Sequence, residues 1–267
     1  MNAFLFSRLG CAAVLLASSA LCGAQGVLER TGPVKDLDFQ DVGRDGPWQR
    51  SAQARLSQPE QQLLQSLTLG RWVDALALLK QQQPDLNRRD EAGLTPLSMA
   101  ARAGQLALVR EMIRQGADVD QIGAGGATPL GAAALAGHEL VVRDLLLQGA
   151  RVDAPGASGQ LPLHLACAAG HTRVVAMLVA QGADWRGLNR QGRHAVAEAA
   201  YFGQIPVLQW FEAAQLDLST PDRYRLNAVH AAALGMQPQA VAWLRDKAVP
   251  VPSVITQVLI DQLASTP

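Results

Sequence analysis

Five histidines are the side chains of this sequence best suited to bind a metal ion or to act as a general base: His138, His164, His171, His194 and His230. A zinc site needs three or four ligands that converge on one point. His138 and His171 each follow a glycine, but no series of Cys, Asp or Glu recurs at a matching spacing. The histidine pattern therefore predicts neither a metal site nor a cofactor.

Nucleophilic chemistry and phosphate chemistry also lack their motifs. A hydrolase needs a nucleophile, a base and an orienting acid within reach, and the sequence contains no G-x-S-x-G, no P-loop and no H-E-x-x-H. The run Gly123-Ala124-Gly125-Gly126 is not followed by Gly-Lys-Ser/Thr, so we interpret its glycines as turn residues. We predict that the protein is not an enzyme. An enzyme with an unrecognised site is the rival hypothesis, and a narrow pocket with convergent polar groups would support it.

Glycines mark the elements that must position these side chains. Eleven glycines recur at one constant interval, in the series Gly93, Gly126, Gly159, Gly192; Gly104, Gly137, Gly170, Gly203; and Gly116, Gly149, Gly182. A four-residue motif recurs at the same interval, as Thr95-Pro96-Leu97-Ser98, Thr128-Pro129-Leu130-Gly131 and Leu161-Pro162-Leu163-His164, and then in weaker form as His194-Ala195-Val196-Ala197 and Asn227-Ala228-Val229-His230. A fixed period between about 20 and 50 residues is typical of a stacked repeat protein.

This pattern resembles the ankyrin repeat, whose signature T-P-L-H-x-A recurs about every 33 residues. The resemblance implies an all-α fold, an ankyrin-repeat solenoid of about six helix-turn-helix repeats joined by short extended turns. It also implies that the histidines are structural, with each imidazole bonded to neighbouring backbone. Proteins of this family usually bind other proteins and catalyse nothing.

The residue types of each repeat favour a pair of helices. Thr95 and Thr128 are suited to cap a helix, and the proline that follows each of them suits the first helical position. The spacing Leu108-Val109-x-x-Met112-Ile113 puts apolar side chains on one face of a second helix. Cys167 falls where the repeat calls for a small buried residue. Because glycines end the helices, we expect a positive φ at positions such as Gly149.

We predict six repeats over residues 57–250, of which the first and the last are atypical. The last repeat has its helix-ending glycine, Gly235, one place early. Terminal copies depart in this way because one of their faces meets water. Residues 251–267 are expected to form a capping helix, whose narrow apolar side is made by Val254, Val258, Leu259 and Leu263. Residues 25–56 fit no repeat, and we expect an extended N-terminal segment there, in which residues 48–56 could be helical.

The first 24 residues have the pattern of a secretory signal peptide. Arg8 is the lone charge, the stretch from Leu9 to Leu21 is apolar, and Cys22-Gly23-Ala24 offers small residues for cleavage. The apolar stretch is shorter than the roughly 20 residues that a membrane-spanning helix needs. We therefore predict cleavage near Ala24, export to a bacterial periplasm and no membrane span after signal removal. Cleavage would leave 22 basic and 23 acidic residues, which argues against nucleic acid as a partner.

The predicted partner surface consists of positions that the repeat leaves free. In ankyrin proteins partners usually contact the concave side, made by turn tips and by the exposed face of the first helices. Here that face is expected to include Met99, Arg102, Leu135, Leu165, Glu198, Tyr201 and Phe202. The C-terminal turn tips carry Arg186, Arg190, Arg193, Arg223, Tyr224 and Arg225. Two alternatives stay open: Tyr201 and Phe202 could fill space against the next repeat, and Asp184, Asp217 and Asp222 could partly neutralise the arginines.

The sequence thus predicts a non-catalytic protein-binding scaffold of the cell envelope that needs no cofactor. Its partner is another protein, whose identity the residues do not indicate. Two alternatives of the same broad class are an antidote (immunity) protein that blocks a toxin and an assembly or stability factor for an envelope enzyme.

Overall fold

The computed structural model describes residues 57–89, 95–123, 127–157 and 159–265. All described residues belong to one compact unit, which lies within Ser51–Pro267. The predicted signal peptide and the predicted extended segment at residues 25–56 lie outside the described residues.

Six pairs of helices and a final single helix make up the described part of the chain. The first helices of the pairs are α3 (Gln58–Thr68), α5 (Pro96–Arg102), α7 (Pro129–Ala136), α9 (Pro162–Ala169), α11 (Ala195–Tyr201) and α13 (Ala228–Leu234). The second helices are α4 (Trp72–Gln82), α6 (Leu106–Arg114), α8 (Glu139–Leu147), α10 (Thr172–Ala180), α12 (Ile205–Ala213) and α14 (Pro238–Asp246), and α15 (Val254–Ser265) follows them. No strand occurs among the described residues. The predicted all-α solenoid is confirmed.

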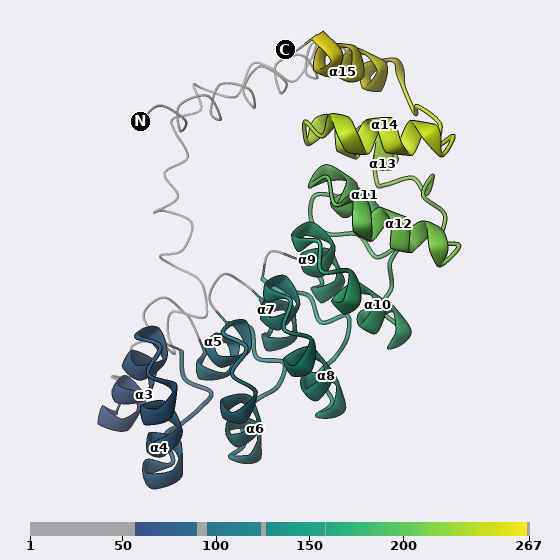
Figure 1. Cartoon of the computed structure of the whole chain (residues 1–267). Coiled ribbons are helices and arrows are strands. Elements are labelled where there is room, and N and C mark those ends of the chain that lie inside the picture. Colours follow the sequence, from purple (N-terminus) through teal and green to yellow (C-terminus); the bar gives the residue numbers. More distant parts are fainter. Residues whose placement is uncertain (1–56, 90–94, 124–126, 158, 266–267) are drawn as a thin grey trace, which may run out of the picture. The chain divides into compact units, whose positions relative to one another are not determined.

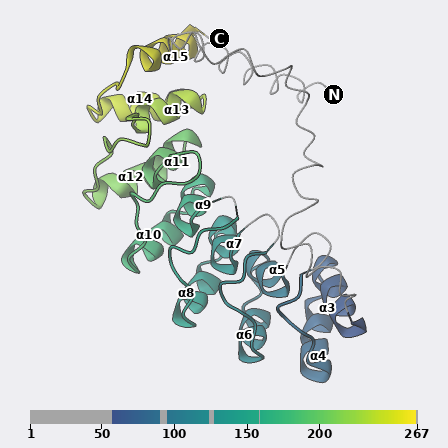
Figure 2. The ribbon, with the colours of Figure 1, turned by 180° about the vertical axis from the view of Figure 1, so that it is seen from behind.

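The helix pairs follow one another in chain order, as Figures 1 and 2 show, with the first helices in one row and the second helices in another. Each first helix packs against the next first helix, and each second helix from α4 to α10 packs against the next second helix. The apolar core therefore runs along the whole stack. Its largest fully buried side chains include Leu97, Leu130 and Leu163 of the first row and Met112, Leu145, Leu178, Phe211 and Leu244 of the second. No described helix has the length and apolar character to cross a bilayer.

The first helices begin as the motif predicts. The hydroxyls of Thr95 and Thr128 accept hydrogen bonds from the backbone N–H groups of Ser98 and Gly131, at 3.3 and 3.1 Å. Such a cap satisfies an N–H group that the helix leaves free and contributes about 1 kcal/mol. Where threonine is lost, at position 194, the imidazole of His194 takes its place: Nδ1 accepts from the N–H of Ala197 at 3.3 Å.

The left-handed backbone positions also recur at equivalent places of successive repeats, and the prediction of a positive φ at Gly149 is confirmed by its value of +87°. Gly93 and Gly126 lie outside the described residues. In the last two repeats the same places are held by other residues: Gln215, Arg225, Met236 and Ala248 have φ between 57° and 59°. The left-handed conformation is therefore kept where the glycine is not.

Gly235 does not end its helix in the way the sequence suggested. Its φ is −76°, and the next residue, Met236, has the left-handed conformation, so the period of the repeat is unbroken. A Cβ atom at position 235 would overlap the carbonyl oxygen of Tyr201. Glycine stands there because α13 approaches the end of α11 closely, a reason that lies in packing and not in backbone conformation.

The final helix, α15, packs against α13 and α14. Its predicted apolar side is only half correct. Leu259 and Leu263 pack against the core, but Val254 and Val258 are exposed, and Thr256 and Ile260 are buried instead. Thr256 is buried because its hydroxyl lies 2.8 Å from Nδ1 of His230 on α13, a polar contact that hydrophobic spacing alone does not reveal.

Candidate protein-binding surface

One face of the first helices presents a row of residues at equivalent places of successive repeats. Arg102, Leu135, Ala168, Tyr201 and Leu234 form this row, and Leu135 and Leu234 are exposed. Beside it, Met99 and Leu165 are half-buried, with small side chains between them in α7. The face is thus apolar from α7 to α9, with Arg102 on one side and Tyr201 on the other.

The aromatic pair Tyr201–Phe202 ends this apolar stretch. Their rings meet edge to face, with centroids 5.1 Å apart. Tyr201 packs against the core and is half-buried, whereas Phe202 is 46% exposed. Four of the other repeats carry Ala103, Ala136, Ala169 and Gly235 at the place of Phe202, and the first repeat carries the exposed Leu69. The fold therefore does not need a large side chain there, and Phe202 is the more accessible of the two aromatics.

The prediction that Glu198 belongs to the exposed face is wrong. Its side chain is 2% exposed and accepts hydrogen bonds from Arg193 Nε at 2.7 Å, Asn189 Nδ2 at 3.1 Å and Gln160 Nε2 at 3.5 Å. Buried carboxylates require such partners, because loss of hydration disfavours the charge. The sequence could not show this, since the partners come from turns before the helix.

Arg193 is likewise not a free turn-tip cation. Its side chain is only 16% exposed, because it pairs with Glu198 and lies over the ring of Tyr201, 4.3 Å from the centroid. A guanidinium over an aromatic face is attracted by the ring's electron density. Arg193 therefore holds Glu198 and Tyr201 in place, and it supports the surface from below.

Four other arginines remain available, and we call Arg186, Arg190, Arg223 and Arg225 the arginine edge. All four are exposed, and no carboxylate of the described residues lies within ion-pair distance of any of them. Tyr224, between two of them, is 65% exposed.

The nearby aspartates were expected as neutralising partners, but they bind the backbone. Asp184 accepts from the N–H of Arg186, and Asp217 and Asp222 accept from other turn N–H groups. Asp217 accepts hydrogen bonds from the hydroxyl and the backbone N–H of Ser219, and these bonds lower its pKa. The charge of Arg186 lowers the pKa of Asp217 further, by a smaller amount. The aspartates thus fix the turns, and the edge keeps four cations that a partner's carboxylates could reach.

The histidines serve the fold, as the resemblance implied. Nε2 of His138 and of His171 lies 3.0 and 3.1 Å from the carbonyl oxygens of Arg102 and Leu135 in the preceding repeat. A carbonyl can only accept, so each Nε2 carries the proton. His164 and His194 are buried, and burial lowers the pKa of both. The described residues contain no group of three or more His, Cys, Asp or Glu that could hold a metal ion.

Cys167 is fully buried, as its place in the repeat indicates. Burial raises the pKa of its thiol well above the ordinary value, and the carboxylate of Glu198 adds to the shift. Because the thiolate is the reactive form, this cysteine is held as a small core side chain and not as a nucleophile.

The comparisons with known proteins agree with the repeat geometry. Residues 70–155 match the family described as Ankyrin repeats (3 copies), and residues 163–212 match the one described as Ankyrin repeats (many copies). The human protein named Ankyrin repeat domain-containing protein 49 is 33% identical over 88 residues, which are 33% of this chain and 37% of that relative. With capped helix pairs at one constant period and matches over both parts of the stack, the chain belongs to the ankyrin-repeat proteins.

Proposed function

We propose that this protein is a non-catalytic scaffold that binds a protein partner through the first-helix face and the arginine edge. Ankyrin repeats are protein-binding modules in general, and the match to them carries this class of function. The observation that supports this particular surface is the exposed ring of Phe202 at a place where four of the other repeats have only alanine or glycine.

The chemistry of the face indicates the chemistry of the partner. Leu135, Leu165 and Phe202 offer apolar area, and aromatic side chains are frequent among the residues that dominate binding energy. The arginine edge offers planar cations that suit carboxylates. A partner that presents an apolar side chain to the row and acidic side chains to the turn tips would be complementary to both.

We also propose export to a periplasm, on the basis of residues 1–24. In that compartment the partner would be an envelope protein, and an antidote or an assembly factor would have the same kind of surface. The mass of the mature protein should correspond to a chain that begins at Gln25. A chain that keeps Met1 in the cytoplasm would contradict the proposed location.

Phe202→Ala is the sharpest test of the surface. The substitution installs the residue that α5, α7 and α9 carry, so we expect the melting temperature to stay nearly constant. A partner captured from a periplasmic extract and then purified should bind this variant at least about tenfold more weakly, as expected for an aromatic interface residue. Gln209→Ala, at an exposed place on α12, is the control and should bind normally.

The arginine edge predicts a second, different effect. Arg223→Ala with Arg225→Ala should mainly slow association, and more so at low salt, because exposed charges steer an encounter more than they hold a complex. Normal binding by both the aromatic and the arginine variants would mean that the partner uses another surface.

A further inference from the structure

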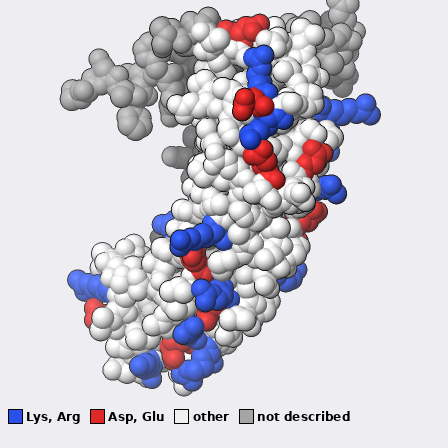
Figure 3. Space-filling view, turned by 45° about the vertical axis from the view of Figure 1, so that its right-hand side comes forward, with Lys and Arg blue, Asp and Glu red and all other residues white. Residues whose placement is uncertain are grey.

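The second helices form a separate surface, where ion pairs close three of the junctions between repeats. Arg110 on α6 binds Asp144 on α8, and Glu139 on α8 lies 3.6 Å from Arg173 on α10. Lys247, the residue after α14, lies 2.9 Å from Glu212 on α12. Figure 3 brings the right-hand side of Figure 1 forward and shows acidic and basic side chains beside one another along the stack. Four cations on or directly after the second helices have carboxylate partners: Arg110, Arg114, Arg173 and Lys247.

The junction between α8 and α10 departs from this arrangement at its centre. Arg143 occupies the place that Arg110 has one repeat earlier, but the place of Asp144 is taken by Met177. Arg143 is exposed, and no carboxylate among the described residues pairs with it. In the two junctions that follow, the place of Met177 is held by Trp210 and Trp243, which are larger.

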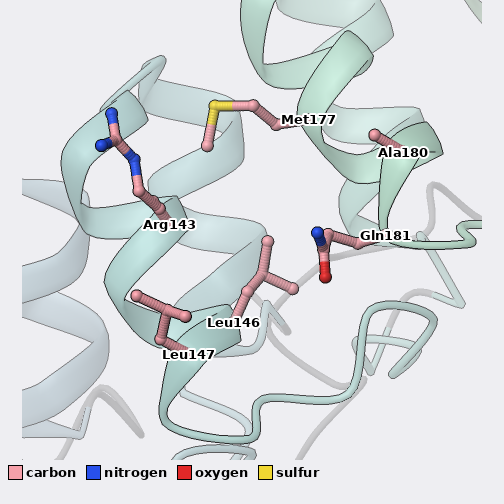
Figure 4. Close-up of a pocket in the computed structure, with 6 residues that line it drawn as sticks. All are labelled: Arg143, Leu146, Leu147, Met177, Ala180 and Gln181. Atoms are coloured by element: carbon pink, nitrogen blue, oxygen red, sulfur yellow. The ribbon is translucent and has the colours of Figure 1, made fainter.

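A groove of about 420 Å³ lies at this junction. Figure 4 shows Arg143, Leu146 and Leu147 of α8 on one side, with Met177 and Ala180 of α10 and the next residue, Gln181, on the other. Its lining is mainly apolar, with one cation at the edge. The groove is open because neither an aspartate nor a tryptophan fills it.

Two strongly exposed leucines lie on α8, and one of them, Leu147, lines the groove. Leu140 is 60% and Leu147 is 77% exposed, and with Arg143 between them they lie at helical spacings of three and four residues on α8. The second helices from α6 to α14 have Ala107, Arg173, Pro206 and Gln239 at the place of Leu140, and Arg114, Ala180, Ala213 and Asp246 at that of Leu147. Only α8 among these combines two leucines with an arginine, so the patch is not a consequence of the repeat.

We propose that this groove binds a helical segment of a protein partner in which a carboxylate is flanked by two apolar side chains. The protein itself shows how the carboxylate would bind: Nε and Nη2 of Arg110 donate to one oxygen of Asp144 at 2.9 and 2.7 Å. At the next junction the partner supplies the carboxylate that Met177 cannot. The partner's apolar side chains cover Leu140 and Leu147, and the removal of this apolar area from water stabilises the complex.

A second copy of this chain is a poor occupant. In a twofold-symmetric contact the same patch meets itself, so two unpaired Arg143 side chains would face each other. Like charges at an interface disfavour the contact. The charge of the patch therefore calls for an acidic segment of another protein.

The test uses the full chain and two labelled helix-forming peptides, with Leu, Glu and Leu or with Leu, Lys and Leu at positions i, i+3 and i+7. Fluorescence anisotropy should show binding of the Glu peptide and at least about tenfold weaker binding of the Lys peptide, because the like charge opposes binding. Arg143→Glu should reverse this preference. Leu147→Ala, which installs the residue of α10 and α12, should weaken the Glu peptide at least about threefold without unfolding the chain.

Two controls separate this surface from the others. Arg245→Glu changes an exposed arginine on α14, and Phe202→Ala changes the first-helix face, so both should leave peptide binding unchanged. Equal binding of the two peptides, or no binding at about 1 mM, would overturn the proposal. So would self-association that sedimentation detects and Leu147→Ala abolishes, because the occupant would then be a second copy.

Discussion

The repeats built on α5 to α10 and those built on α11 to α14 have the same helix geometry but reach it with different residues. In the earlier repeats Gly137, Gly149 and Gly170 hold left-handed positions, whereas Met236 and Ala248 hold equivalent positions in the last repeat. A side chain in this conformation costs roughly 1 kcal/mol or more. The difference teaches that the stack, and not each residue's own preference, imposes the backbone conformation.

The same comparison bears on function. The earlier repeats follow the motif closely and present aliphatic side chains such as Leu135 and Leu165, while the later repeats contain Tyr201, Phe202, the buried pair Arg193–Glu198 and the arginine edge. Departures that weaken a repeat are retained most easily where they serve something besides folding. In the proposed partner surface, the divergent repeats therefore add an aromatic ring and four cations to the apolar side chains of α7 and α9.

The largest effect on the later repeats is expected from Glu198→Ala. It leaves the guanidinium of Arg193 without its partner at a site only 16% exposed, and it also removes the acceptor of Asn189. Breaking a buried pair usually costs about 3–5 kcal/mol. Because Arg193 keeps some contact with water, we expect about 2 kcal/mol. Urea unfolding followed by tryptophan fluorescence measures it.

The matched control is a double-mutant cycle. Ala132 and Ala231 stand at the place of Glu198 in two other repeats, so alanine fits there once the cation is gone. The double variant Arg193→Ala with Glu198→Ala should therefore lose much less unfolding free energy than the two single variants lose together. Additive losses would show that the two side chains act independently.

Local rules predicted much of this fold, because caps, prolines and helix-ending glycines act within a few residues of one another. Thr95, Thr128 and Gly149 are examples that sequence alone places correctly. Contacts between turns and helices were not predictable in the same way. Glu198 was expected on the exposed face because partners of ankyrin proteins usually contact that side of the first helices, and only the turn residues Asn189 and Arg193 explain its burial.

The final helix and the groove show a second limit of prediction from the sequence. Hydrophobic spacing assigned Val254 and Val258 to the buried side of α15, whereas the buried side follows the contact between Thr256 and His230. The exposure of Leu147 could have been suspected from the sequence. A comparison of equivalent places in successive repeats sets it against arginine, alanine and aspartate, all of which suit a surface.

An effect of intermediate size is expected from pH. Burial lowers the pKa of His164, His194 and His230, so the folded chain resists taking up protons that the unfolded chain accepts. The contribution of these histidines to the free energy of unfolding is fully present above their pKa in the unfolded chain, about 6.5. It is lost as the pH falls from there through their lower pKa values in the folded chain. The free energy of unfolding should therefore fall between pH 7.5 and pH 5, and each of the three histidines should contribute to the fall.

His194→Thr isolates one of these contributions. Threonine is the cap residue of two earlier repeats, so its hydroxyl can accept from the N–H of Ala197, although the bond from His194 to the Thr220 carbonyl is lost. The variant should be less stable by about 1 kcal/mol at pH 7.5, and this deficit should shrink as the pH falls. A deficit that is constant over the whole range would show that His194 does not titrate on unfolding.

The smallest and most direct test exchanges residues between the two regions at one place of the repeat. Gly149 and Ala248 occupy equivalent places three repeats apart, with φ of +87° and +57°, and a Cβ at Gly149 would meet no atom within 4 Å. Contacts therefore do not decide the outcome at Gly149, and both positions are exposed. Gly149→Ala should destabilise the chain by about 1 kcal/mol, and Ala248→Gly should stabilise it by somewhat less, because glycine adopts this conformation freely but gains more freedom on unfolding.

Thermal unfolding of the two variants and of the exchange carrying both measures this. The two substitutions should change the stability in opposite directions, and the variant that carries both should have nearly the stability of the original chain. If both substitutions destabilise, the last repeat has adapted to its alanine, and the two regions differ in more than residue preference.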